Sequence, residues 1–226
     1  MSRGVGFRAF KNIERPAKEV IELFRGIPVA NIADNMNRLY CVDTAIRPMN
    51  KRPVLGCAFT VKVSAGDNLM IHKALHMAKP GDIIVVDGCG YLQRSLMGEI
   101  MFTQMKVLGL GGLIVDGAIR DVDCLENFDM PVYARGVTPR GPYKHGYGEV
   151  NVPVCIGGQV VMPGDIIVGD MDGIVVIRPE DAFEIADLGK KHNQKEEAIF
   201  ADLKKGVMDT AWIEKTTTEK GIVIFD

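Results

Sequence analysis

Apolar residues along the chain are grouped into short runs separated by turn-forming residues. The run at residues 54–64 (VLGCAFTVKVS) is rich in β-branched and aromatic side chains, which predicts a strand. Shorter apolar runs predict further strands at residues 83–86, 113–115, 132–135, 152–156, 159–161, 166–168 and 174–177. We expect the last four, which are short and separated by turns, to be antiparallel in part.

Helices are predicted before and between these strands. Segment 16–25 begins with a proline and is followed by Gly26, an arrangement typical of a helix. Further helices are expected at residues 29–39, 69–78 and 98–108, with a short one near Arg120 and a long one at residues 179–205. The alternation of strands and helices predicts an α/β fold with a partly parallel sheet. No interdomain linker is recognisable, so we expect a single domain over residues 1–226.

One turn sequence occurs twice. Pro80-Gly81-Asp82 and Pro163-Gly164-Asp165 each precede an apolar strand. Proline followed by glycine suits a type II turn, because glycine accepts the positive φ of the third turn position. The repeat is too short to indicate a duplicated domain.

The composition excludes several classes of protein. The 226 residues carry a net charge of −2, so the chain lacks the basic surface that nucleic acid or an anionic membrane requires. Five scattered cysteines without a CxxC pair argue against a disulfide framework or a zinc ribbon. There is no run of 18 apolar residues and no apolar signal core near the N-terminus. We therefore expect a cytoplasmic protein without nucleic-acid or membrane partners.

Candidate chemistry is concentrated in a short stretch that begins with Gly98-Glu99 and ends with Arg120-Asp121. A guanidinium can hold a small carboxylate substrate through two parallel hydrogen bonds. Asp121 can hold a hard divalent cation such as Mg²⁺. Glu99 can hold a water or move a proton. Together these residue types indicate metal-assisted chemistry on a 2-oxo acid.

The start of the helix at residues 98–108 offers a second contribution. If Gly98 lies at the helix start, the backbone amides of Ile100 and Met101 have no acceptor within the helix. We expect them to bind the substrate carboxylate at the positive end of the helix. Gly98, without a side chain, would let the substrate approach closely.

Spaced motifs across the chain resemble those of a known family. They are GDN (66–68), PGD-strand-DG (80–88), GE (98–99), GG-strand-DGAIRD (111–121), GGxxVxPGD (157–165) and GDxDG (169–173). Over residues 27–206 this pattern resembles the 4-hydroxy-4-methyl-2-oxoglutarate aldolase family, which also contains the regulator of ribonuclease activity A. The DGAIRD segment with its upstream acid is the specific part of the match.

The resemblance implies a swivelling β/β/α-type domain with mixed sheets and a long C-terminal helix. Residues 27–206 would be the family core, 1–26 a helical N-terminal extension and 207–226 a C-terminal tail. The resemblance further implies homotrimers or homohexamers with active sites at subunit interfaces.

The resemblance also implies an activity. It is that of a class II pyruvate aldolase that uses Mg²⁺ or Mn²⁺ and usually also decarboxylates oxaloacetate. Arg120 and Asp121 match the family's Arg-Asp pair, and Glu99 matches its upstream acid. Either Glu196 or Glu197 of a neighbouring subunit would contribute to the water shell of the metal.

Other functions are compatible with the sequence. Lys62 in the strand FTVKV could form a Schiff base with pyruvate if burial lowered its pKa. A binding protein that inhibits a ribonuclease would need neither Arg120 nor Asp121. A methyltransferase is disfavoured, because no glycine-rich loop is followed by an acid suited to S-adenosylmethionine.

Several polar residues have structural as well as functional interpretations. His72 and His76 are four residues apart on one predicted helix, where packing or capping is favoured over a metal site. Turn formation is favoured over metal binding for Asp116, Asp170 and Asp172. The loop at residues 139–148 carries four polar side chains that could read a second substrate carboxylate, although surface solvation is the simpler interpretation. They are Arg140, Lys144, His145 and Tyr147.

Overall fold

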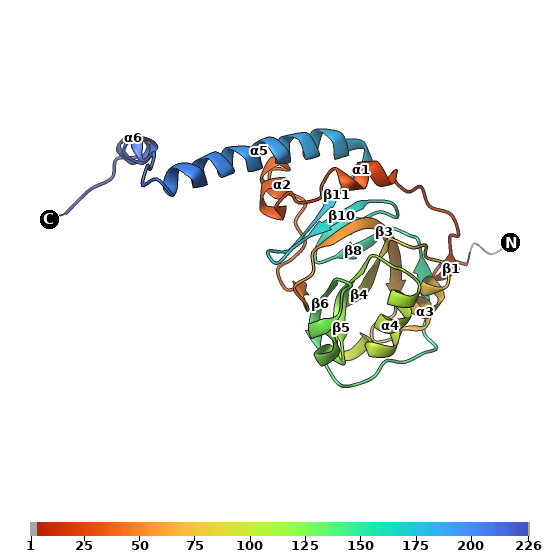
Figure 1. The fold of residues 1–226 in the computed structure, drawn as a ribbon. Coiled ribbons are helices and arrows are strands. Elements are labelled where there is room, and N and C mark those ends of the chain that lie inside the picture. The colour runs from red at the N-terminus through yellow and green to blue at the C-terminus, as the bar shows by residue number, and fades with distance from the viewer. Residues whose placement is uncertain (1–3, 226) are drawn as a thin grey trace.

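Four parallel strands form the centre of the protein, a computed structural model of which describes residues 4–225 (Figure 1). They are β3 (Val54–Val63), β4 (Asp82–Met97), β5 (Gly112–Ile119) and β6 (Val132–Val137), which lie side by side in this order. The parallel arrangement expected from strand-helix alternation is confirmed.

Antiparallel and edge strands complete a nine-stranded mixed sheet. Its main path runs β1-β7-β3-β4-β5-β6-β2, and β10 pairs with both β3 and β11. The bounds are β1 (Phe7–Ala9), β2 (Arg47–Pro48), β7 (Gly148–Val150), β10 (Ile166–Gly169) and β11 (Ile174–Ile177). A separate hairpin consists of β8 (Val154–Ile156) and β9 (Gln159–Val161). The late strands are antiparallel in part, as expected.

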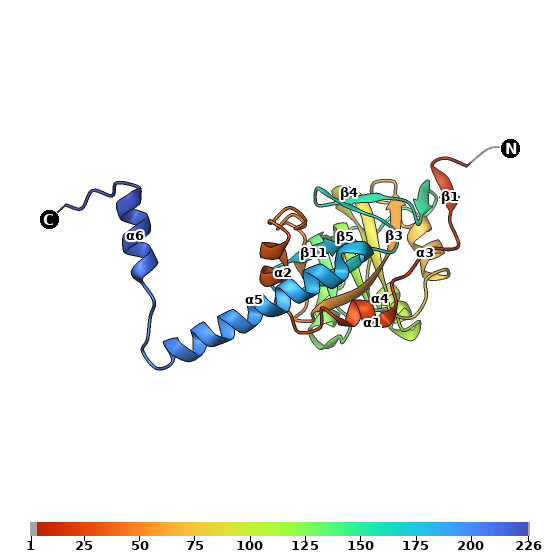
Figure 2. The same cartoon turned by 90° about the horizontal axis from the view of Figure 1, so that it is seen from above.

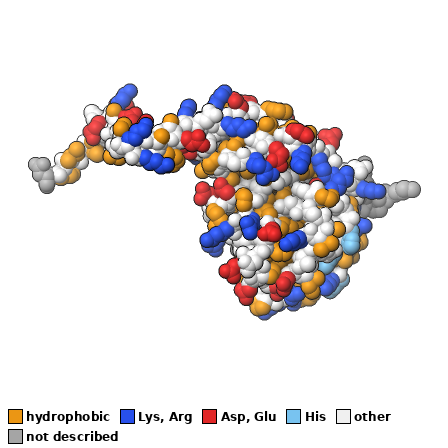
Figure 3. All heavy atoms as spheres, in the orientation of Figure 1, with side chains coloured by type: hydrophobic (Ala, Val, Ile, Leu, Met, Phe, Trp, Pro, Cys, Tyr) orange, Lys and Arg blue, Asp and Glu red, His pale blue; other side chains and the backbone are white. Residues whose placement is uncertain are grey.

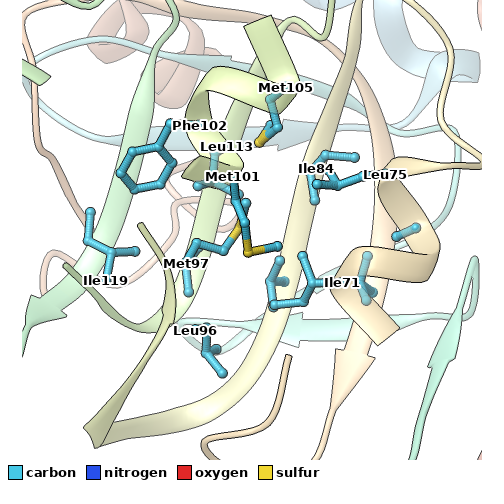
Figure 4. Close-up of a cluster of buried hydrophobic side chains, with 14 of the residues drawn as sticks. Ile71, Leu75, Ile84, Leu96, Met97, Met101, Phe102, Met105, Leu113 and Ile119 are labelled. Carbon is cyan, nitrogen blue, oxygen red and sulfur yellow. The ribbon is translucent and has the colours of Figure 1, made fainter. Parts of the chain in front are cut away.

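The central strands are buried on both faces. Successive side chains of a strand point to opposite faces, and accordingly Ile84 and Val86 of β4 belong to one buried cluster while Ile83 and Val85 belong to another. Helices α3 (Leu69–Leu75) and α4 (Glu99–Val107) cover the first face. Figure 4 shows Met101 and Met105 of α4 and Ile71 and Leu75 of α3 gathered over β4 and β5.

A third cluster forms where α1 (Lys18–Glu22), α2 (Val29–Asn35) and the first part of α5 (Ala182–Leu203) cover β10 and β11. Small residues of α5, Ala182, Ala186 and Gly189, are buried there. Beyond its hydrogen bonds to α2, which reach as far as Glu196, α5 leaves the body and is followed at its far end by α6 (Ala211–Glu219) (Figure 2). Charged and apolar side chains alternate over this projecting arm (Figure 3). The mixed α/β fold with a long C-terminal helix is confirmed, and no helix among residues 4–225 is both long and apolar enough to cross a membrane.

The two Pro-Gly-Asp turns share more than their sequence. Gly81 and Gly164 both have positive φ, 87° and 99°. Each following aspartate is buried and accepts a hydrogen bond from the amide three residues before it, Lys79 for Asp82 and Met162 for Asp165. Each carboxylate also pairs with a distant arginine: Arg15 with Asp82 and Arg178 with Asp165. Each turn therefore anchors a distant segment of the chain, the one that carries Arg15 or Arg178, to the start of a strand.

Both terminal segments differ from expectation. The N-terminal extension is only partly helical, because Phe7–Ala9 forms strand β1 beside β7. The predicted helix 16–25 is reduced to Lys18–Glu22, and the short strand Arg47–Pro48 had no predicted counterpart. The C-terminal tail contains helix α6, and Asp226 of that tail lies outside the described residues.

Strands β4 and β5 extend well beyond their predicted ends. The segment Asp87-Gly88-Cys89-Gly90 was expected to be a loop, but β4 continues through it to Met97 with shifts in register against β5. The positive φ of Cys89 and Gly90 marks the irregularity, so the turn-forming residues bend a strand that does not end there. Strand β5 likewise continues to Ile119.

The helices differ less from their predicted lengths than strands β4 and β5 do. The helix expected at 29–39 ends at Asn35, since Asn37 and Arg38 have positive φ. The helix expected at 69–78 ends at Leu75. The segment near Arg120 is the 3₁₀ helix η1 (Val122–Asn127), and the long C-terminal helix begins with the 3₁₀ turn η2 (Pro179–Asp181).

Candidate active site

The ends of two neighbouring strands bring the predicted site residues together. Met97 at the end of β4 pairs with Ile119 at the end of β5. The residues that follow them, Gly98 and Arg120, are therefore neighbours in space. The amide of Arg120 donates a hydrogen bond of 3.0 Å to the carbonyl oxygen of Met97, which closes this junction.

Asp121 is held in an unusual backbone conformation. Its φ of 58° and ψ of 39° are left-handed, a conformation in which aspartate is tolerated better than most non-glycine residues. Its carboxylate oxygen Oδ2 accepts a hydrogen bond of 3.1 Å from the amide of Glu99 and lies 3.4 Å from Nε of Arg120. The other oxygen, Oδ1, has no partner among the described residues. One carboxylate oxygen thus remains for a ligand.

Gly98 is required by the space around it. A Cβ at this position would collide with Oδ2 of Asp121 and would lie 2.9 Å from Cγ and 3.0 Å from Nε of Arg120. The φ of Gly98 is −155°, so the backbone itself would accept any residue. The glycine lets the side chains of Arg120 and Asp121 lie against the start of α4.

The amides at the start of α4 are used differently from expectation. The amide of Met101 is not free, because it donates a hydrogen bond of 2.9 Å to the carbonyl oxygen of Gly98. The tight first turn of the helix satisfies this donor internally. The amide of Ile100 finds no acceptor within residues 4–225. The start of α4 therefore presents one free donor instead of the expected two.

A hollow of about 90 Å³ lies against these residues. Gly98, Ile100, Met101 and Arg120 line it, together with two residues of the segment that begins α3, Asn68 and His72. Lys144 of the loop at residues 139–148 also lines it. Four of the six residues predicted to form the site thus share one hollow.

Asn68 and His72 are the site residues that sequence reasoning missed. Asn68 belongs to the GDN motif, and His72 follows it by one helical turn. Burial, Lys144 and His76, in that order, lower the pKa of His72 below that of an ordinary imidazole. Figure 3 shows histidines on the side of the body where Figure 1 places α3. The sequence signal was the GDN motif itself, which entered the sequence analysis only as part of the family pattern.

Glu99 and Asp121 are the acidic side of the site. The side chain of Glu99 is exposed and makes no hydrogen bond or ion pair among the described residues. Burial raises the pKa of the Cys124 thiol, and the charges of Glu99 and Asp121 raise it further.

The donor set fits magnesium better than zinc. Among residues 4–225 no cluster of three or more His, Cys, Asp or Glu side chains could enclose a metal ion. Structural and catalytic zinc sites need three or four such ligands. Mg²⁺ is commonly held by one or two carboxylates, with water and substrate oxygens in the remaining positions. Asp121 with its unpaired Oδ1 matches that arrangement.

Other polar candidates have structural partners. Lys62 has a side chain that is 52% exposed and lies 3.8 Å from Asp87, so it lacks the buried setting that a Schiff-base lysine needs. Asp116 pairs with Arg135 and accepts a hydrogen bond from the amide of Gly157. Its role is to fasten the β8–β9 hairpin to the sheet.

Asp170 and the loop at residues 139–148 are likewise anchored. Asp170 accepts hydrogen bonds from the amides of Val29 and Asp172, which agrees with a turn-forming role. In the loop, the amides of His145 and Gly146 donate to Asp67. The ring of Tyr147 packs edge-on against Phe7. Of the four polar loop residues named in the sequence analysis, Lys144 alone lines the hollow.

The mixed α/β fold, with its candidate site at the ends of β4 and β5, can now be compared with known protein families. The family model described as RraA-like (Aldolase/RraA) matches residues 29–176. A protein of Halalkalibacterium halodurans is 38% identical over 199 residues, which cover 87% of this chain and 95% of the relative. It carries the provisional name 4-hydroxy-4-methyl-2-oxoglutarate aldolase. The chain belongs to the RraA-like family.

Solved structures agree with this assignment. RraAS2 of Streptomyces coelicolor, described as an unusual member of the RNase ES inhibitor RraA protein family, is 27% identical and has a TM-score of 0.75. The alignment covers 82% of this chain and 98% of that one. An uncharacterized protein from Pseudomonas syringae shares the fold with a TM-score of 0.77 at 24% identity, over 87% of this chain and 97% of that one.

Proposed function

We propose that the protein is a divalent-metal-dependent pyruvate aldolase. It cleaves 4-hydroxy-4-methyl-2-oxoglutarate or a related 4-hydroxy-2-oxo acid, and it decarboxylates oxaloacetate through the same pyruvate enolate. The observation that carries the proposal is that Arg120 and Ile100, whose amide finds no acceptor within residues 4–225, line one small hollow, and that the carboxylate of Asp121 lies against Arg120. The family and the name of the Halalkalibacterium halodurans relative support it.

The pyruvate half of the substrate binds at the start of α4. The amide of Ile100 donates to the carboxylate, where the positive end of the helix favours negative charge. Arg120 holds the same carboxylate or the ketone oxygen. Removing one positioned donor of this kind typically costs about 10²–10³ in rate.

Asp121 is the residue that would hold Mg²⁺ or Mn²⁺, through its unpaired Oδ1. When bound, such a cation stabilises the negative charge that develops on the ketone oxygen as the carbon–carbon bond breaks. The hydrogen bond from Glu99 and the guanidinium of Arg120 keep the carboxylate of Asp121 in place. The aspartate is therefore oriented before any ligand arrives.

Proton transfer is assigned to Glu99. Its exposed side chain has no competing partner within residues 4–225. It can hold a water that takes the proton of the C4 hydroxyl and later returns a proton to the pyruvate methylene carbon.

We also propose a homotrimer or homohexamer with a further acid supplied by the neighbouring subunit. Two residues of α5 are candidates. Glu196 is already bound by Asn31 of its own chain at 2.8 Å, whereas Glu197 pairs only along its own helix, with Asn193 at 3.0 Å. Glu197 is therefore the freer of the two.

The test is pyruvate release from oxaloacetate and from 4-hydroxy-4-methyl-2-oxoglutarate, with and without Mg²⁺. Asp121→Asn is the informative variant, because asparagine tolerates the left-handed backbone and can still accept from Glu99. The wild type should require the metal, and the variant should lose most of its activity while remaining folded. Equal turnover by both proteins would refute the metal assignment.

A ribonuclease regulator is the second candidate function. The description of the Streptomyces coelicolor relative as a member of an RNase inhibitor family supports it. Inhibition by surface binding would not depend on Asp121. A protein that releases no pyruvate but inhibits an RNase E-type enzyme equally well as wild type and as Asp121→Asn would establish this function instead.

A further inference from the structure

The loop at residues 139–148, which joins β6 to β7, forms one wall of the hollow beside Arg120. Pro142 and Lys144 of this loop line the hollow. A Cβ placed on Gly141 would lie 3.3 Å from Nη1 of Arg120, so the backbone of the loop lies close against the guanidinium. Whatever holds this loop therefore decides the shape of the hollow.

The carboxylate of Asp67 holds the loop from the start of α3. Asp67 is 3% exposed. Its Oδ2 accepts hydrogen bonds from the backbone amides of His145 at 2.9 Å and Gly146 at 2.7 Å, and its Oδ1 accepts one of 2.9 Å from the amide of Leu69. Hydrogen bonds to an ionised acceptor are stronger than those between neutral groups. One buried side chain thus ties the loop to the first residue of α3.

The backbone at Lys144 is held from both sides. On one side, the amide of Tyr143 donates a hydrogen bond of 2.8 Å to the carbonyl oxygen of Gly66, and its carbonyl accepts one of 3.0 Å from the amide of Asn68. On the other side, Asp67 binds the amides of the next two residues. The cationic residue of this wall therefore has its place set by the segment that leads into α3.

The contact between Asp67 and Gly146 leaves no room for a side chain. A Cβ on Gly146 would lie 2.7 Å from Cγ and 2.8 Å from Cβ of Asp67. The φ of Gly146 is not positive, so its backbone would accept any residue. Glycine is needed at this position because the loop must come close enough for its amides to reach the carboxylate.

We infer that Asp67 is a positioning residue that holds the loop at residues 139–148 against Arg120 and thereby completes the hollow that takes the substrate. The inference rests on the proposed function and adds a residue that is not among those lining the hollow. Asp121 is held separately, by the amide of Glu99. Release of the loop should therefore weaken substrate binding more than it slows bond cleavage.

The experiment measures pyruvate release from oxaloacetate by Asp67→Ser. A serine hydroxyl can still accept from the amide two residues on, as aspartate does in the turn before α3, but it is too short to reach the loop. A lost hydrogen bond of this kind corresponds to roughly a tenfold change in an equilibrium constant. KM should rise by about that factor, while kcat stays within about twofold.

Gly146→Ala disturbs the same contact from the loop side. Its methyl group would collide with Asp67, so the loop must move away, and KM should rise as in Asp67→Ser. Because both changes release one and the same contact, the double variant should show little more than the larger single effect. Effects on KM that multiply in the double variant would contradict a shared cause.

Asp170 provides a matched control. It too accepts from the amide two residues on, Asp172 at 2.9 Å, and from a distant amide at the start of a helix, Val29 at 3.0 Å. It lines a different hollow. Asp170→Ser should therefore leave KM and kcat unchanged, even where denaturant titration shows a comparable loss of stability.

Hydrogen exchange follows the loop without reference to activity. The amides of His145 and Gly146 donate to a buried carboxylate in the wild type, so they should exchange faster in Asp67→Ser. Their exchange should be unchanged in Asp170→Ser.

The outcomes are distinguishable. A rise in KM together with faster exchange of the loop in Asp67→Ser supports the inference, and if this variant does not fold, Gly146→Ala decides by the same two measurements. An unchanged KM, unchanged exchange, a loss confined to kcat, or an equal rise of KM in Asp170→Ser overturns it and leaves the aldolase proposal standing. A wild type that releases no pyruvate from either substrate refutes the proposed function, and with it the role of Asp67 in substrate binding.

Discussion

The backbone amide of Glu99 donates a hydrogen bond of 3.1 Å to the carboxylate of Asp121, 22 residues further along the chain. This contact ties the first turn of α4 to the end of β5. It also occupies the carboxylate oxygen that faces Arg120 and leaves the other oxygen unpaired. The start of α4 thus orients the carboxylate of Asp121, and this carboxylate in turn lies against the guanidinium of Arg120.

The tightness of that junction can be tested with Gly98→Ala. The added Cβ would collide with Asp121 and would lie within 3.0 Å of Arg120, so both side chains must move. We expect a loss of about 10² in kcat/KM for pyruvate release, the size associated with one displaced electrostatic partner. Steady-state kinetics with oxaloacetate would measure it. A variant with wild-type rates would show that Arg120 and Asp121 do not act from the positions seen here.

The buried ion pair between Arg15 and Asp82 should stabilise the fold. Two hydrogen bonds of 2.8 and 2.7 Å join them, and Asp82 is almost fully buried. Arg15→Ala would leave a buried carboxylate without its partner, which typically costs about 3–5 kcal/mol in the free energy of unfolding. Denaturant titration would measure the difference.

The control for this variant is Arg25→Ala, which removes an arginine from the exposed pair with Glu22. Exposed pairs contribute little to stability, so this change should be small. Equal effects of the two substitutions would show that burial of Asp82 does not decide the stability of the N-terminal segment.

His72 should make stability depend on pH. Its pKa in the folded protein is lowered by burial and by the facing groups Lys144 and His76, and Arg120 lines the same hollow. As pH falls through about 6.5, the ordinary value for imidazole, the unfolded chain takes up the proton before the folded one. The free energy of unfolding therefore decreases with acid in this range.

Denaturant titrations between pH 5 and pH 7.5 would check this dependence. His72→Gln should flatten the decrease below pH 6.5, because glutamine does not titrate. The control is His76→Gln, which removes an exposed histidine from the end of the same helix. A wild-type slope in His72→Gln would contradict the assignment.

Cys57 should be unreactive in the folded protein. Burial raises the pKa of its thiol to about 12, with a further increase from Asp82. The thiolate is the reactive form, so alkylation at pH 8 should modify the exposed Cys41, Cys89 and Cys155 and spare Cys57. Mass spectrometry of the native and the denatured protein would show the difference. Rapid native labelling of Cys57 would mean that β3 opens locally.

The sequence was sufficient where a local pattern decides the structure. Strand β3 was predicted to within one residue, because its β-branched and aromatic run has no competing interpretation. Helix α4 was predicted nearly to its ends, since Gly98 precedes it and a glycine-rich segment follows. The Arg120-Asp121 pair could be proposed as the reactive centre from its chemistry and its motif. Identification of these elements needed no long-range contact.

Tertiary structure decided what depends on distant partners. Strands β4 and β5 run past their turn-forming glycines because each supplies the other's hydrogen bonds. The amide of Met101 is satisfied by Gly98, a detail of one helical turn that composition does not reveal. Asn68 and His72 reach Arg120 because α3 and α4 pack on the same face of the sheet. Sequence thus determined the elements and their reactive groups, whereas packing determined which of those groups meet, because hydrogen-bond partners and burial are properties of the assembled chain.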